Sequence, residues 1–170
     1  MQKRVITLVL SAAVVVAVAC QSDEEVTAPS SKILTFKAVM NGAGEVPANS
    51  TTGTGTFTAT LDTATNLFTY DIVFSGLGSN VNNGHIHGPA AATATAGTTI
   101  NFNTWPGAQF SFGLRAGTGH GVAILSASNP ITATISGDSL KKLLFAGLTY
   151  ANIHTTGNPG GEIRGQILKQ

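Results

Sequence analysis

Two histidine-containing segments carry the side chains of this chain that are best suited to chemistry. Residues 84–88 read GHIHG and residues 150–167 read YANIHTTGNPGGEIRGQI, so three of the four histidines lie in these segments. His85 and His87 are two residues apart, a spacing that on a β-strand places both side chains on one face, about 7 Å apart. Two such imidazoles can bind one metal ion, with His154 as a third ligand from a neighbouring strand. Copper or zinc would suit this ligand set.

The fourth histidine is a weaker candidate ligand. His120 lies in the sequence GTGHG, which predicts a glycine-rich turn rather than a strand.

A structural role for the same residues is the alternative, and the sequence alone favours it. Glu45, Glu162 and Arg164 would form a closed polar network with the histidines that satisfies buried groups and fixes strand register. Glu162 and Arg164 are two residues apart, so on a strand they share a face, where such pairs commonly bridge to neighbouring strands. Pro47 predicts extended backbone at the residue before it and a turn at Glu45, whose carboxylate would fold back toward the histidines.

No catalytic constellation is predicted, and we expect a protein that is not an enzyme. No serine lies in a GxSxG elbow and no phosphate-binding loop occurs. Only 10% of the residues are charged and the net charge is +1, which argues against nucleic-acid binding.

The N-terminal segment predicts export and lipidation. Residues 1–19 combine Lys3 and Arg4 with an apolar run of about fifteen residues, which is shorter than the roughly twenty that span a bilayer. The run ends in Ala-Val-Ala before Cys20, the only cysteine, which resembles the lipobox of bacterial lipoproteins. We therefore expect a signal peptide, a lipidated Cys20 and a flexible linker over residues 20–31. An ordinary signal peptide with an unrelated cysteine is the alternative.

Residues 32–170 have the size of one domain, and short alternating stretches in them are typical of half-buried strands. The predicted strands cover residues 32–41, 53–62, 66–77, 84–88, 98–102, 109–114 and 121–126. The short turn at residues 63–65 predicts a hairpin. A short helix is expected at residues 138–145, with Asp138 as its N-cap. The pattern predicts an all-β protein, an antiparallel β-sandwich of the immunoglobulin or superoxide-dismutase-like Greek-key type.

The strand at residues 66–77 gives the clearest prediction of a core. Phe68, Tyr70, Ile72 and Phe74 alternate with more polar residues and share one face, which we expect to be buried.

Three motifs resemble the CHRD domain, which occurs in the animal protein chordin and in many bacterial secreted proteins. They are Glu45-Val46-Pro47, the sequence GHIHGPA from Gly84, and the stretch from Gly147 to Ile167. The resemblance runs from about residue 34 to 168, although residues 90–129 carry no recognisable motif. The matching positions are Glu45, Pro47, His85, His87, Gly88, Tyr150, Asn152, His154, Pro159, Gly160, Gly161, Glu162, Arg164 and Gly165.

The resemblance implies an extracytoplasmic β-sandwich without an established reaction. A fainter similarity to copper/zinc superoxide dismutase lacks that family's disulfide cysteines and zinc-loop ligands, so dismutase activity is not expected. We expect a non-enzymatic binding or structural lipoprotein of the bacterial envelope, anchored in the outer membrane and facing the periplasm or the cell surface. Its partners would be the lipid bilayer and an extracytoplasmic protein or glycan, contacted by the loop at residues 90–106. The alternative is a copper- or zinc-binding redox protein that uses His85, His87 and His154.

Overall fold

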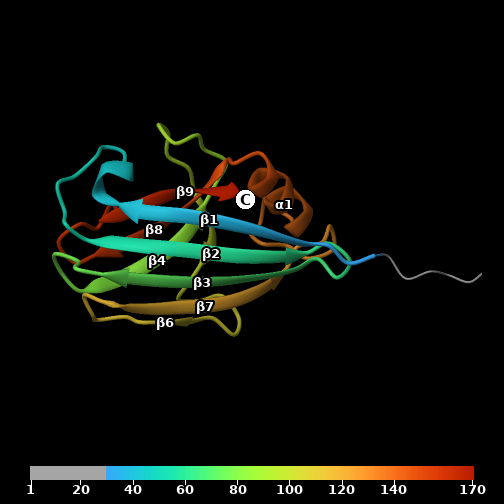
Figure 1. Ribbon diagram of the computed structural model, residues 1–170, viewed down its shortest axis with the longest axis horizontal. Helices are drawn as coiled ribbons and strands as arrows, with labels where there is room; N and C mark the ends of the chain where they lie inside the picture. The colour runs from blue at the N-terminus through green and yellow to red at the C-terminus, as the bar shows by residue number, and fades with distance from the viewer. Residues whose placement is uncertain (1–29) are drawn as a thin grey trace, which may run out of the picture.

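The computed structural model describes residues 30–170 (Figure 1). The predicted signal peptide, Cys20 and most of the predicted linker lie outside these residues. No helix within residues 30–170 has the length and apolar character that crossing a bilayer requires.

Residues 30–170 are all-β with one short α-helix, as the alternation predicted. Its strands are β1 Ile33–Asn41, β2 Thr54–Asp62, β3 Leu67–Ser75, β4 Val81–His87, β5 Thr98–Asn101, β6 Gln109–Phe110, β7 Gly117–Ile124, β8 Thr149–Thr155 and β9 Ile163–Lys169. A short 3-10 helix, η1, covers Gly42–Gly44, and α1 covers Gly137–Phe145. The predicted strand at residues 109–114 is reduced to two residues, while β4 and β7 begin before their predicted starts.

The strands form one antiparallel sheet in the order β5-β4-β8-β9-β1-β2-β3-β7-β6. The sheet curls into a sandwich-like shape, and in Figure 1 the layer of β1, β2, β3 and β7 lies in front of β4 and β8. The two layers are joined through the β1–β9 pair, so the sandwich is a single folded sheet. The hairpin predicted at residues 63–65 is confirmed by the antiparallel pairing of β2 with β3.

The space between the layers holds the hydrophobic core. Phe68, Tyr70, Ile72 and Phe74 on β3 are each at most 2% exposed, which confirms the predicted buried face. Tyr70 packs against Phe102 from the other side of the core, with ring centroids 5.3 Å apart. This aromatic packing fixes which face of each strand points outward.

Two local predictions were wrong. The N-cap of α1 is Ser136, whose hydroxyl accepts from the Ser139 amide, whereas Asp138 lies in the first turn and pairs with Lys141 at 2.7 Å. The GTGHG segment forms β7 rather than a turn.

Aromatic side chains explain the glycines of β7. A Cβ atom at Gly121 would overlap the Tyr70 hydroxyl, and one at Gly119 would overlap the Phe110 ring. Glycine is therefore needed on the inward face, and His120 points outward between the two.

Candidate metal centre

The outward faces of β4, β8 and β9 carry a row of polar side chains. The strand register places His85 opposite Asn152 and His87 opposite Tyr150, and it places Asn152 opposite Arg164 on β9. All five are buried, although they lie on the side of the sheet away from the hydrophobic core.

The loop at residues 88–97 covers this row and is held down by side chains of β9. The Arg164 Nη2 group donates to three carbonyls within residues 91–94, the shortest bond being 2.7 Å to Ala94. Gln166 Nε2 donates to another carbonyl of the loop at 2.8 Å. These contacts account for the burial of a guanidinium that is only 2% exposed.

His87 is held in a stack of three side chains. Its ring lies parallel to the Tyr150 ring at 4.7 Å between centroids, and the Arg164 Cζ atom lies 3.5 Å from the Tyr150 centroid. The His87 Nδ1–H group donates to the Ala96 carbonyl at 3.0 Å. Because a carbonyl only accepts, this bond places the proton on Nδ1 and leaves a lone pair on Nε2. That Nε2 atom is buried and has no hydrogen-bond partner among residues 30–170.

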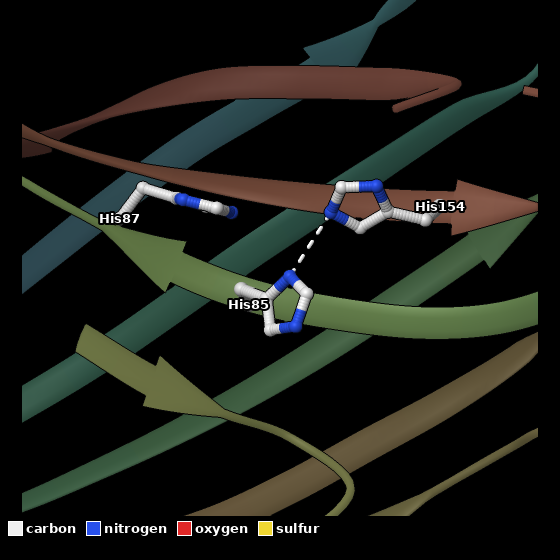
Figure 2. Close-up of side chains that lie close together, drawn as sticks. All are labelled: His85, His87 and His154. Atoms are coloured by element: carbon white, nitrogen blue, oxygen red, sulfur yellow. Dashed lines mark hydrogen bonds between the residues drawn. The ribbon is translucent and has the colours of Figure 1, made fainter. Parts of the chain in front are cut away.

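His154 has the same arrangement. Its Nδ1–H group donates to the Pro159 carbonyl at 2.9 Å, which leaves a lone pair on Nε2. That lone pair accepts from the His85 Nδ1–H group at 3.0 Å. Figure 2 shows the tip of the His87 ring directed toward the same space between β4 and β8.

One nitrogen from each of the three rings lies within 4.8 Å of the others. Nitrogen atoms that bind one zinc ion at about 2.0–2.1 Å lie roughly 3.3 Å apart in tetrahedral geometry. The His85 and His154 nitrogens lie 3.0 Å apart, and the widest pair must close by about 1.5 Å. Ligation through His85 Nδ1 also requires the proton of that ring to move to Nε2. Metal-binding histidines commonly donate their other ring N–H group to a backbone carbonyl, as His87 and His154 do here, and this bond orients the ring.

The protonation state of the three rings favours metal binding. Burial lowers the pKa of His85 to about 4, helped by the neighbouring His154 and His87 rings. Burial likewise lowers the pKa of His87 to about 4 and lowers the pKa of His154. The three imidazoles are therefore neutral at neutral pH, so each ring has one lone pair that can bind a metal ion.

Glu45 lies beside this row, bound to Asn152 rather than to a histidine. Its Oε1 atom accepts from Asn152 Nδ2 at 2.6 Å. Burial raises its pKa to about 7, against the opposite effects of Arg164 and of the Asn152 hydrogen bond.

Glu162 belongs to a separate network. Its carboxylate accepts from the Thr51 and Thr155 hydroxyls, both at 2.6 Å, and from the Gly78 amide. Burial opposes its ionisation, but these hydrogen bonds together lower its pKa. Arg164 donates to backbone carbonyls and makes no ion pair with Glu162 in the described chain.

The structure thus divides the predicted network into a histidine cluster, a Glu45–Asn152 pair and a Glu162 anchor. His120 joins none of them: on the outward face of β7 it contacts Asp71 of β3, with 2.8 Å between His120 Nδ1 and Asp71 Oδ1. The roles of the Ala96 and Pro159 carbonyls could not be predicted from the sequence, since every residue carries a carbonyl.

A cleft of about 420 Å³ lies next to the row, between residues 43–48 and the loop at residues 88–97. Arg164, Gln166 and Glu45 line it together with small apolar residues. The Gln166 Oε1 atom is buried and has no partner in the described part of the chain.

Comparison with known families agrees with the motifs. A family model for the CHRD domain matches residues 36–167, more than half of the chain and the range that contains the whole histidine cluster. No curated protein and no solved structure matches.

Proposed function

The chain belongs to the CHRD domain family, whose domains are in general binding or structural modules, and from this premise we propose that it binds a transition-metal ion. The ligands are His85, His87 and His154, and the ion is copper or zinc. One observation carries the proposal: three neutral imidazoles converge, and backbone carbonyls direct a lone pair of His87 and of His154 into the shared space.

A titration of the purified, metal-free protein tests this proposal. The wild type is expected to bind one equivalent of copper or zinc, and elemental analysis of the loaded protein gives the stoichiometry. His87→Ala combined with His154→Ala is expected to weaken binding at least 100-fold, whereas His120→Ala leaves it unchanged. A wild type that binds no ion, or the same affinity in the double variant, would rule the function out.

The proposal includes a lipid tether at the bacterial envelope, supported by the sequence around Cys20. Several acyl chains on one cysteine would anchor the domain stably outside the cytoplasm. The protein made in a bacterium is expected to incorporate a fatty-acid label and to sediment with outer membranes, and Cys20→Ser is expected to abolish both. Labelling that persists in Cys20→Ser would contradict this assignment.

A second candidate function is the binding of a glycan in the 420 Å³ cleft. The Arg164, Gln166 and Glu45 side chains give its walls polar groups suited to hydroxyl groups. Binding to an array of defined glycans that is lost in Ala48→Trp, which fills the cleft, would support this function. A ligand retained by Ala48→Trp would exclude the cleft as its site.

A further inference from the structure

The charges around the histidine cluster bear on which ion it holds. We propose that the cluster selects the monovalent cuprous ion over Zn(II) and Cu(II). This inference rests on the proposed metal site and adds to it the charge and identity of the ion.

The histidine cluster is buried and has no compensating negative charge among its ligands. His85 and His87 are each only 9% exposed, and all three ligands are neutral imidazoles. Moving an ion from water into a protein interior costs solvation energy, and this Born cost rises with the square of the charge. A divalent ion therefore loses about four times the solvation energy of a monovalent one of the same size, and no anionic ligand among residues 30–170 offsets that loss.

The groups that hydrogen-bond to the ligand rings are neutral. Three histidines hold catalytic zinc in other proteins, where water takes the fourth position and carboxylates often support the rings. Here the rings of His87 and His154 are supported by the neutral carbonyls of Ala96 and Pro159. Asn152, opposite His85, is neutral as well.

The charged side chains nearest the cluster are those of Arg164 and Glu45. The Arg164 guanidinium lies on the far side of the Tyr150 ring that stacks on His87. The Glu45 carboxylate bonds to Asn152 and to none of the three histidines. The charged group stacked behind the cluster is therefore positive, which disfavours a second unit of charge on the ion.

Competition with chromogenic chelators tests the selectivity on the purified protein. Cu(I) is titrated under a reductant without oxygen, and Zn(II) and Cu(II) are titrated separately in air. Cu(I) is expected to bind at least 100-fold more tightly than Zn(II). Tighter binding of Zn(II) or Cu(II) than of Cu(I) would overturn this inference and leave metal binding intact. A protein that binds none of the three ions would instead overturn the proposed function.

A change of one charge at constant volume provides the sharper test. Asn152→Asp is made together with Glu45→Gln, because Asn152 donates to Glu45 at 2.6 Å and two carboxylates at that distance would share a proton. Relative to Glu45→Gln alone, the carboxylate opposite His85 is expected to strengthen Zn(II) and Cu(II) binding at least tenfold, with a smaller change for Cu(I). Thr58→Asp adds the same charge on the exposed face of β2 and is expected to leave the ratio unchanged. Equal changes for all three ions, or none, would overturn the argument from charge.

A second pair of variants keeps the inference testable if Asn152→Asp does not fold. Arg164→Gln removes the positive charge and is expected to shift the preference toward divalent ions, whereas Arg164→Lys retains the charge and the preference. The same ratio in both variants would count against the charge mechanism.

Discussion

Outward-facing histidines occur on both halves of the curled sheet, in opposite surroundings. On β7, the His120 side chain is 47% exposed and contacts a carboxylate, Asp71, at 2.8 Å. On β4 and β8, His85, His87 and His154 contact each other and backbone carbonyls, and no carboxylate of residues 30–170 bonds to them. The strands are alike in type and alternation. The two halves differ in the segments that cover their outward faces. The loop at residues 88–97 and the turn that contains Pro159 lie over β4 and β8 only, and we call these two segments the cover.

This difference shows that the loops, more than the strands, turn a row of histidines into a set of ligands. Strand pairing brings the rings within reach, but the carbonyls of the covering segments select the ring nitrogen that keeps its lone pair. Burial then holds the rings neutral. Variants that loosen the cover should make the two halves behave alike.

The largest effect is expected from removing the Glu162 anchor of the covered half. Glu162→Ala leaves the Gly78 amide and the Thr51 and Thr155 hydroxyls without their acceptor. Each buried donor left unsatisfied costs about 1–3 kcal/mol, so the free energy of unfolding should fall by roughly 3 kcal/mol or more. Urea denaturation measures the loss. Asp71→Ala on the open half is the matched control, and an equal loss in both variants would contradict the distinction.

Acid is expected to have the next largest effect, through the buried histidines. In the metal-free protein the pKa values of His85 and His87 are about 4, below the unfolded value of 6.5, so their contribution to stability is present above pH 6.5 and is lost as pH falls toward 4. Glu45, raised to about 7 from 4.5, acts oppositely, because the folded state gains stability as pH falls from 7 to 4.5. The net loss of unfolding free energy from pH 7 to pH 5 should be about 2 kcal/mol.

Glu45→Gln separates the two contributions. Without the opposing carboxyl, the loss between pH 7 and pH 5 should be about twice that of the wild type. Thermal or urea unfolding at several pH values, with a chelator present, gives both slopes. A shallower slope in Glu45→Gln would mean that the signs assigned to these groups are wrong.

A smaller effect is expected from loosening the loop over the histidines. Arg164→Lys keeps the charge but loses the planar group that stacks on Tyr150 and binds the carbonyls of residues 91–94. The free energy of unfolding should fall by about 1–2 kcal/mol, and the amides of the loop should exchange hydrogen faster. Arg115→Lys is the matched control, since Arg115 binds one carbonyl, that of Leu77. Unchanged exchange in the loop of Arg164→Lys would show that Arg164 does not hold the cover.

The alternation of apolar and polar residues along the strands was sufficient to predict which faces carry the core and the histidines of this site. It identified the buried face of β3 and placed His85 and His87 on one face, because side-chain direction along a strand is a local property. The convergence of His154 on this pair depended on β8 lying beside β4, which followed from treating both segments as neighbouring strands.

The remaining features depend on contacts between residues far apart in the chain. Glycines beside His120 suggested a turn because glycine is common in turns, but here they make room for Tyr70 and Phe110 from other strands. Glu162 was expected to share a face with Arg164, yet β9 begins at Ile163 and the carboxylate turns to Gly78. Such cross-chain packing leaves no local pattern in the sequence.

The smallest effect is expected on the open half, where His120 and Asp71 form an exposed pair with side chains 47% and 63% exposed. Solvent and salt screen such pairs, which contribute less than about 1 kcal/mol. A double-mutant cycle with His120→Asn and Asp71→Asn should therefore give a coupling below that value at low salt and close to zero at high salt, with metal affinity unchanged in all variants. A large coupling that persists in salt would mean that the open half also shields its histidine, and that the cover over β4 and β8 is not what distinguishes the two halves.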